Sequence, residues 1–264
     1  MLGGIVVSTM CSLLSVYVVL RRMAFIGQGI SHSALGGFAL GLLLFGAAPA
    51  AALKVDITAL TFCLVVAGLI ALTTRHSKIS EDSAIGIFFV ASTALGAIFF
   101  RMAPGYKDIY SYLFGSIFGM DYAQLWTAAV LAIVVIIPLF LFHKELLFYT
   151  FDEEMAGVSG VPVNFLHLLL LGLLTLTIII SARLVGVLLV SAFLILPGTI
   201  AQLMTQSFNR MLLAAVLTGI LTTVVGLVVS NFTDWPTGAA IVLVQVAVFS
   251  IMFAWRKFQG TLSV

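Results

Sequence analysis

The sequence predicts an all-α membrane protein, a polytopic transmembrane helical bundle of about eight or nine spans. Hydrophobic residues make up 62% of the 264 positions and charged residues only 8%, whereas soluble domains are close to a quarter charged. The mean hydropathy is +1.24, and a chain of this length cannot bury that much apolar surface in a water-soluble core. No polar stretch is long enough for a second domain, so residues 1–264 are expected to form a single transmembrane domain.

Nine apolar runs come close to the roughly 20 residues that a helix needs to cross a bilayer. They are residues 2–20, 26–48, 57–73, 84–100, 123–142, 164–181, 185–203, 211–230 and 238–255. A further run, 109–119, is too short to cross and is expected to form a short re-entrant or interfacial helix. The first run has arginines after it and no positive residue before it, which is the polarity of a retained helix rather than of a signal peptide. The spacing Gly37-x-x-x-Gly41 predicts a close contact between helices.

Lysine and arginine residues are enriched in cytoplasmic loops. If the loop after 123–142 is cytoplasmic, eight of them fall inside: Arg21, Arg22, Arg75, Lys78, Lys144, Arg210, Arg256 and Lys257. Four fall outside: Lys54, Arg101, Lys107 and Arg183. This bias predicts a cytoplasmic C-terminus and, with nine spans, an external N-terminus; with eight spans the N-terminal side is reversed.

The carboxylates all lie in loops or at the ends of spans. They are Asp56, Glu81, Asp82, Asp108, Asp121, Glu145, Asp152, Glu153, Glu154 and Asp234. Ion-coupled secondary transporters usually place an acidic residue at membrane depth, so this distribution argues against proton or sodium coupling. The sequence also lacks a glycine-rich phosphate loop and the motifs of intramembrane hydrolases, and its scattered basic residues give nucleic-acid binding no support. We therefore expect a transport subunit rather than an enzyme.

One histidine, His32, lies within an apolar run. If its helix starts at the inner interface near Arg22, a rise of 1.5 Å per residue puts His32 about 15 Å deep, close to the midplane. Gln28 comes four residues earlier, on the same helix face. Neutral imidazole is a common ligand for zinc and related transition metals. Two interpretations follow: a pair of metal ligands, or a histidine that hydrogen-bonds to a neighbouring helix.

The cytoplasmic loop at about 143–163 has the pattern of a short helix. Thr150 and Glu153 have the spacing of a capping box, and acidic residues suit the positive end of a helix dipole. Gly157 or Gly160 can end that helix, and Pro162 stops it. The loop is then either a solvated connection or a docking helix that is moved by a cytoplasmic partner protein. The residues expected to couple it are Asp152, Glu153, Met155, Ala156 and Gly157.

Eight segments, spread in order along nearly the whole chain, form a specific set. They are LRRMAFIG at 20–27, SHSALGG at 31–37, SAIGI at 83–87, YLFGSI at 112–117, the loop 152–163, VGVLLV at 185–190, LILP at 194–197 and DWPTGA at 234–239. Together they resemble the permease subunit of bacterial zinc/manganese-type metal-ion ABC importers.

The resemblance implies a fold like that of type II ABC importer permeases, in the bacterial inner membrane. It implies a second permease copy, identical or paralogous, a cytoplasmic dimer of ABC ATPases that binds the ATP, and an extracytoplasmic metal-binding protein. The cargo would be a divalent zinc, manganese or iron ion, with no permanently bound cofactor. Of the two positions that contact the metal in this family, His32 matches, whereas Gln28 stands where the family usually has an acidic residue. An amide oxygen coordinates a cation more weakly because it carries no charge.

The main prediction is therefore the membrane-spanning permease of an ATP-driven importer of divalent transition metals. The alternative is a secondary metal transporter or channel that acts without an ATPase partner. A structural or regulatory membrane subunit is a third possibility, and it would not need His32. Neighbouring genes for an ATPase and a secreted metal-binding protein would separate the first class from the others.

Overall fold

The computed structural model describes residues 2–46, 48, 51–76, 79–103 and 122–259, and every element in these ranges is helical. The helices are α1 (Leu2–Leu20), α2 (Ala24–Phe45), α3 (Ala52–His76), α4 (Glu81–Met102), α6 (Tyr122–Leu141), α7 (His143–Phe151), α8 (Glu153–Val158), α9 (Val163–Val185), α10 (Val187–Phe193), α11 (Leu196–Met204), α12 (Phe208–Thr233) and α13 (Thr237–Phe258). The short helix expected at 109–119 lies outside the described residues.

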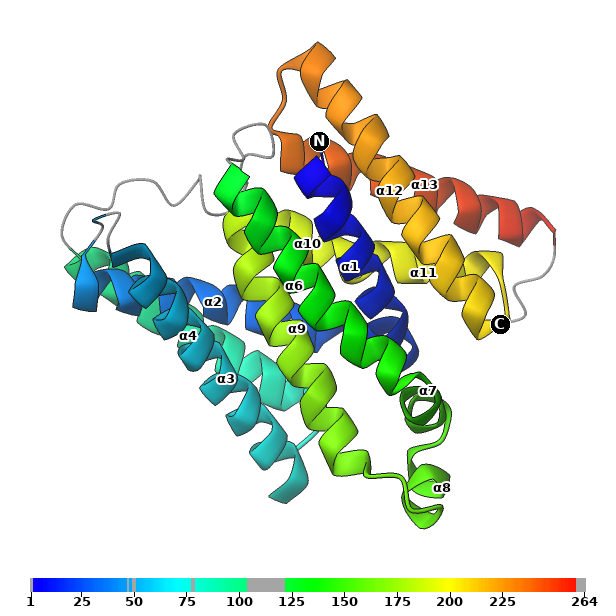
Figure 1. Ribbon diagram of the computed structural model, residues 1–264, viewed down its shortest axis with the longest axis horizontal. Helices are drawn as coiled ribbons and strands as arrows, with labels where there is room; N and C mark the ends of the chain where they lie inside the picture. The colour runs from blue at the N-terminus through cyan, green and yellow to red at the C-terminus, as the bar shows by residue number, and fades with distance from the viewer. Residues whose placement is uncertain (1, 47, 49–50, 77–78, 104–121, 260–264) are drawn as a thin grey trace.

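The number of spans agrees with the prediction. Among the described residues, eight segments are long and apolar enough to cross a membrane, and a ninth is counted if α6 and α7 form one bent span. The two helices of that pair meet at 71°. The bend turns α7 away from the direction of α6, so α7 leads out of the bundle toward α8 (Figure 1).

Helix α2 occupies a central place, packed against α3 and α4 on one side and against α9 on the other (Figure 1). A Cβ atom at Gly37 would lie 2.8 Å from the Cα of Ala59, and one at Gly41 would lie 2.9 Å from the Cα of Val55. Only residues without a side chain allow two backbones to approach so closely. The close contact predicted from the glycine spacing is confirmed, and α3 is the partner.

The expected span 185–203 is interrupted. Gly186 has a φ of 91°, in the left-handed region that favours glycine, and it separates α9 from α10. A second break follows at Leu194 and Ile195, before Pro197 in the first turn of α11. Proline suits a first turn because its missing N–H is not needed there. The chain therefore passes through this part of the bundle as two short helices.

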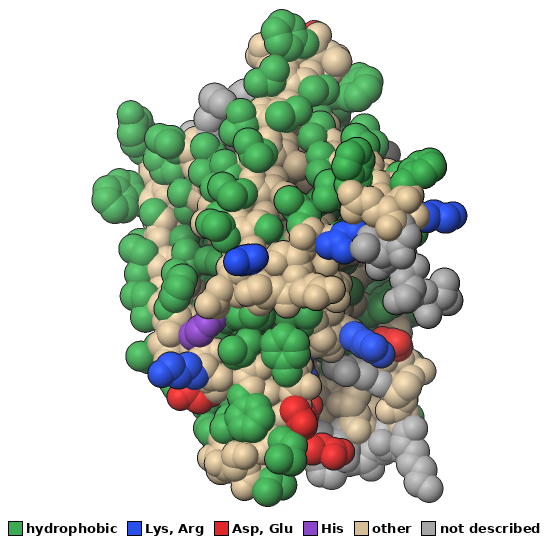
Figure 2. All heavy atoms as spheres, turned by 90° about the vertical axis from the view of Figure 1, so that its right-hand side faces the viewer, with side chains coloured by type: hydrophobic (Ala, Val, Ile, Leu, Met, Phe, Trp, Pro, Cys, Tyr) green, Lys and Arg blue, Asp and Glu red, His purple; other side chains and the backbone are tan. Residues whose placement is uncertain are grey.

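Large apolar side chains cover the outer surface of the bundle. Examples from five helices are Leu69 on α3, Ile98 on α4, Ile137 on α6, Leu221 on α12 and Ile251 on α13, all of them exposed. Figure 2 shows such side chains over the upper half of one face, with charged side chains gathered in its middle and lower parts. So large an apolar surface is the one that a bilayer covers.

Candidate functional site

Helix α2 is enclosed on most of its circumference but leaves one stripe accessible. Ile26, Ile30 and Ala34 are fully buried or nearly so, whereas Phe25 is 63% exposed. Gln28 is also exposed, and His32 is partly so. Positions 25, 28 and 32 are three and four residues apart, so they share one face of the helix. The chain's own helices therefore leave the two predicted ligands accessible from outside α2.

The side chains of Gln28 and His32 are in contact. The Nε2 atoms of the amide and of the imidazole are 3.2 Å apart. The amide nitrogen donates this hydrogen bond when the imidazole carries its proton on Nδ1. The partner that the structure gives His32 is thus on its own helix, four residues earlier.

Phe89 of α4 fixes the orientation of the imidazole. The ring centroids of His32 and Phe89 are 4.9 Å apart, and the rings meet edge-on at 78°. This is a favoured geometry for aromatic rings. It holds the histidine with one side against α4 and leaves the side with Gln28 free to face a ligand.

A cavity of about 340 Å³ opens beside this pair, within the range of small-ligand sites. It is lined by Gln28, His32, Val187, Leu188, Ser191, Ala192, Ile195 and Leu196. The last six come from α10, from the break that follows it and from the first residue of α11. Irregular backbone at membrane depth is tolerated where it lines a cavity. Pro197 lies inside the run 185–203 and indicates a kink there, whereas the other break, at Gly186, was not predicted.

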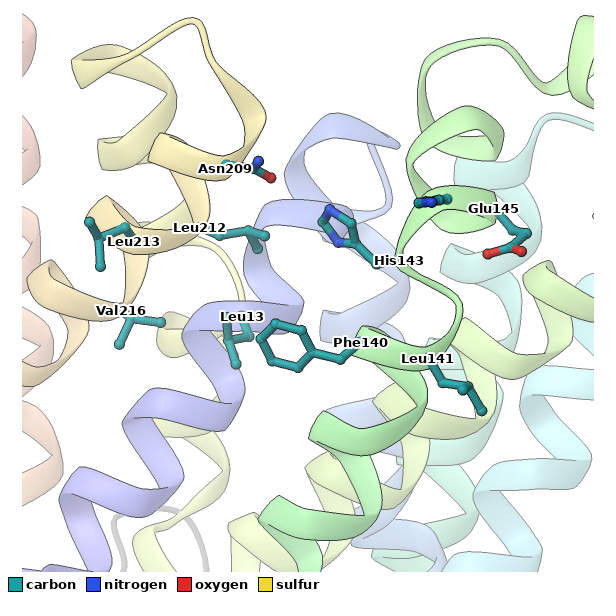
Figure 3. A pocket seen from close by; sticks show the side chains of 10 residues that line it. Leu13, Phe140, Leu141, His143, Glu145, Asn209, Leu212, Leu213 and Val216 are labelled. Carbon is teal, nitrogen blue, oxygen red and sulfur yellow. The ribbon is translucent and has the colours of Figure 1, made fainter.

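A second, larger cavity of about 750 Å³ lies away from these residues. It is lined by Leu13, Phe140, Leu141, His143, Lys144, Glu145, Asn209, Leu212, Leu213 and Val216. Figure 3 shows Leu13 and Phe140 pointing toward each other across this groove. Its lining is mostly apolar, and the Lys144 ammonium lies among its few polar side chains, next in sequence to His143 and Glu145, where it repels a cation. The 340 Å³ cavity is therefore the better candidate for a cation pathway.

Within the part of the chain that the structure describes, no three His, Cys, Asp or Glu side chains converge to hold a metal ion. Gln28 and His32 supply two donor groups at most. Stable transition-metal sites in proteins commonly use three or four protein ligands. The pair can therefore contact a passing ion but does not by itself form a resident metal site.

The predicted docking segment, residues 143–163, contains two helices rather than one. Asp152, in an extended conformation between α7 and α8, accepts a hydrogen bond at Oδ1 from the backbone N–H of Met155 at 2.9 Å. Asp152 is therefore the N-cap of α8. The predicted capping box is wrong, because the Thr150 hydroxyl lies within α7 and donates to the Leu146 carbonyl oxygen at 2.6 Å. The left-handed Gly160, with a φ of 83°, follows the end of α8.

The predicted coupling residues gather on α8, at one extremity of the molecule (Figure 1). Asp152, Glu153, Met155 and Gly157 are exposed, and Ala156 is fully buried. The carboxylate of Glu153 is paired with Arg21 at 2.6 Å. Ala156 thus anchors the helix to the bundle, while most of its other residues face outward.

The comparisons with known proteins agree with this architecture. The profile of the ABC 3 transport family matches residues 1–256. The chain belongs to this family. It is similar to the manganese transport system membrane protein MntC of Listeria monocytogenes, with 34% identity over 99% of this chain and 91% of that protein. It is also similar to the chelated iron transport system membrane protein YfeD of Yersinia pestis, with 34% identity over 97% of this chain and 84% of that protein.

A solved structure shares both fold and sequence with this ABC 3 family member. It is PsaBC from Streptococcus pneumoniae in complex with Fab, with a TM-score of 0.84, 31% identity, and coverage of 98% of this chain and 93% of that chain. The resemblance found from the sequence motifs is confirmed. The chain is a multi-pass cell-membrane protein and a permease subunit of an ABC transport system. The relatives favour this main prediction over a transporter that works without an ATPase.

Proposed function

We propose that this chain is the transmembrane permease of an ATP-driven importer of divalent transition-metal ions, with manganese or iron as the first candidates. The observation that carries the proposal is the Gln28–His32 pair, in contact at 3.2 Å and facing the 340 Å³ cavity. The relatives named as manganese and chelated iron transport proteins support the choice of cargo. Zinc, which also accepts imidazole and oxygen ligands, is the third candidate.

The pair supplies the two donor atoms that such an ion accepts. A half-turn of the Gln28 carboxamide exchanges its oxygen and nitrogen, so that Oε1 lies beside Nε2 of His32. One carbonyl oxygen and one imidazole nitrogen are ligands that manganese and iron share. Since Gln28 carries no charge, the ion is held weakly, and weak binding suits a site from which the cargo must leave.

A second permease copy completes the pathway in this proposal. Phe25, Gln28 and His32 form a stripe that the chain's own helices leave accessible. A copy facing this stripe would enclose the cavity and bring further ligands. The second copy is either the same chain or a paralogue that keeps the acidic residue usual in the family.

The free energy for transport would come from ATP hydrolysis by a cytoplasmic dimer of ABC ATPases that binds α8. Asp152, Met155 and Gly157 present the exposed surface of this helix, and buried Ala156 ties it to the bundle. ATP would bind to the partner only. An extracytoplasmic metal-binding protein would deliver the ion to the opposite face. Residues 1–264 would thus act as one permease domain, with 143–163 as its coupling segment.

Reconstitution tests this proposal. Vesicles that contain the permease, its ATPase and its metal-binding protein should accumulate manganese or iron only when ATP is supplied to the ATPase side. Competition among manganese, iron and zinc then ranks the cargo. Uptake that is independent of ATP, or ATP hydrolysis that moves none of the three metals, would contradict the proposal.

A further inference from the structure

The turn between α1 and α2 carries an arginine whose side chain reaches the docking segment. We propose that Arg21 is the positioning residue that transmits movement of α8 to the metal-bearing helix α2. This inference rests on the proposed function, because it concerns how a partner ATPase would act on the Gln28–His32 pair. It has two requirements. The Arg21 side chain must contact both α7 and α8, and the turn formed by residues 21–23 must transmit their movement to α2.

The guanidinium of Arg21 contacts α7 and α8 at the same time. Its Nη2 lies 2.6 Å from Oε2 of Glu153, the first residue of α8. The same nitrogen donates to the Tyr149 hydroxyl at 2.8 Å, and Nη1 donates to the Tyr149 backbone carbonyl oxygen at 3.1 Å. The central carbon of the guanidinium also lies 3.9 Å from the centroid of the Tyr149 ring. One side chain thus spans the junction at which α8 leaves α7.

The geometry of these contacts suits arginine and not lysine. A planar guanidinium presents several N–H groups in a fixed fork and stacks on an aromatic face, whereas an ammonium is a single point charge. The contact with Glu153 has the short distance of a charge-assisted hydrogen bond. A lysine at position 21 would keep the charge and three N–H donors, but its single nitrogen cannot occupy both Nη positions and does not stack on the Tyr149 ring.

Tyr149 extends the connection to α9. Its side chain is fully buried, and its hydroxyl lies 2.9 Å from Nδ1 of His167. Helix α9 packs against α2 and ends at Gly186, from which α10 leads to the wall of the 340 Å³ cavity. The contacts of Arg21 therefore link α8 to α2 and, through Tyr149 and α9, to α10; both α2 and α10 line the cavity.

The turn that bears Arg21 is short and tightly bonded. Only residues 21–23 join α1 to α2. The Arg21 N–H donates to the Tyr17 carbonyl oxygen at 2.9 Å, and the Met23 N–H donates to the Val18 carbonyl oxygen at 2.8 Å. Gln28 follows Arg21 by seven residues, about two helical turns. A displacement of Arg21 cannot be absorbed by slack in the chain, so it moves the first turns of α2.

Stability alone does not account for this arrangement. The side chain of Arg21 is only 16% exposed, and removing a cation from water offsets much of what an ion pair contributes. Its Nε is buried and, within the part of the chain that the structure describes, has no hydrogen-bond partner. An Nε–H group without a partner in this arrangement is able to form a new hydrogen bond if the side chain changes partners between two states.

The test compares Arg21→Lys and Tyr149→Phe with the neighbouring control Arg22→Ala, in vesicles that hold the complete complex. Three quantities are measured: the amount of ATPase bound to the permease, the ATP hydrolysed, and the manganese taken up. We expect Arg21→Lys to keep the ATPase bound and active but to lower the manganese taken up per ATP hydrolysed by about fivefold or more, the scale of a typical coupling between sites. Tyr149→Phe should give a smaller loss of the same kind, and Arg22→Ala should behave as the wild type.

The outcomes separate this inference from the proposed function. A normal uptake-to-hydrolysis ratio in both Arg21→Lys and Tyr149→Phe, alongside a working wild type, would overturn the role of Arg21 and leave the importer proposal standing. Loss of uptake in strict proportion to loss of bound ATPase would also overturn it, since that is what a merely structural role predicts. A wild-type complex that hydrolyses ATP and moves no manganese, iron or zinc would contradict both.

Discussion

At the Gln28–His32 stripe, two polar side chains meet at 3.2 Å beside a cavity that is otherwise largely apolar. Where α7 meets α8, a guanidinium instead holds a hydroxyl, a carbonyl and a carboxylate at 2.6 to 3.1 Å. The first region has few polar contacts and leaves its side chains accessible. The second is dense in polar contacts and largely enclosed around Tyr149.

In the proposed function, the two regions have different tasks. A site for cargo in transit must release what it binds, so few ligands and no local negative charge are an advantage there. A junction that transmits force must not slip, so several strong contacts on one rigid side chain are an advantage there. Substitutions in the two regions should therefore impair transport in different ways.

The largest expected effect is that of His32→Ala. This change removes the imidazole from the pair and should reduce metal uptake to background, because Gln28 alone offers one neutral oxygen. The amount of protein in the membrane should stay unchanged, since His32 is only partly buried. Uptake of radioactive manganese, normalised to permease content, measures the effect.

The matched control is His76→Ala, which removes a histidine at the end of α3, a helix that is not among those lining the 340 Å³ cavity. It should retain uptake. Normal uptake in His32→Ala would remove that residue from the mechanism, and equal losses in both variants would indicate a general effect of losing a histidine.

Gly157→Arg should have the next largest effect, at the other region. A Cβ at Gly157 lies 3.8 Å from Cγ2 of Val163, an ordinary contact, so the substitution leaves the fold intact and places a charge on the exposed face of α8. A charge without a partner in an interface weakens binding, and we expect uptake and stimulated ATP hydrolysis to fall together by about tenfold.

Co-purification of the ATPase with the permease measures this loss directly. Gln206→Arg adds the same charge at an exposed position between α11 and α12 and should leave the complex intact. An undiminished complex with Gly157→Arg would show that the ATPase does not bind this face of α8.

The smallest effect is expected at Arg22, between the two regions. Its φ is 57°, in the left-handed region, which costs a non-glycine residue of order 1 kcal/mol. Arg22→Gly relieves this strain but makes the unfolded chain more flexible. The net change in unfolding free energy should stay below about 1 kcal/mol. Thermal unfolding in detergent checks this, and a large destabilisation would show that the Arg22 side chain makes contacts that hold the turn.

Features set by local chemistry were predictable from the sequence. The apolar runs predicted the spans, the glycine spacing predicted that α2 makes a close contact with another helix, and the four-residue interval predicted that Gln28 and His32 share a face. Each of these follows from helix periodicity and the dimensions of the bilayer.

Features set by contacts between distant segments were not predictable in this way. Arg21 was expected to mark the inner interface, but its partner Tyr149 lies 128 residues further along the chain. The break at Gly186 falls inside a continuous apolar run, where hydropathy gives no signal, and only Pro197 indicates an interruption of this span. The cap of α8 was assigned to Thr150 rather than to Asp152, because hydroxyl and carboxylate caps two residues apart are both compatible with the local sequence.

Equilibrium binding of manganese to the isolated permease tests the central claim, that Gln28 and His32 contact the ion together, most directly. Gln28→Glu keeps the shape of the side chain and adds the charge that the family usually has. We predict that Gln28→Glu binds manganese roughly tenfold more tightly than the wild type, equivalent to about 1.4 kcal/mol. Electron paramagnetic resonance of the free ion measures this affinity. The gain should vanish in the double variant Gln28→Glu/His32→Ala, whereas an equal gain with and without His32 would contradict the claim.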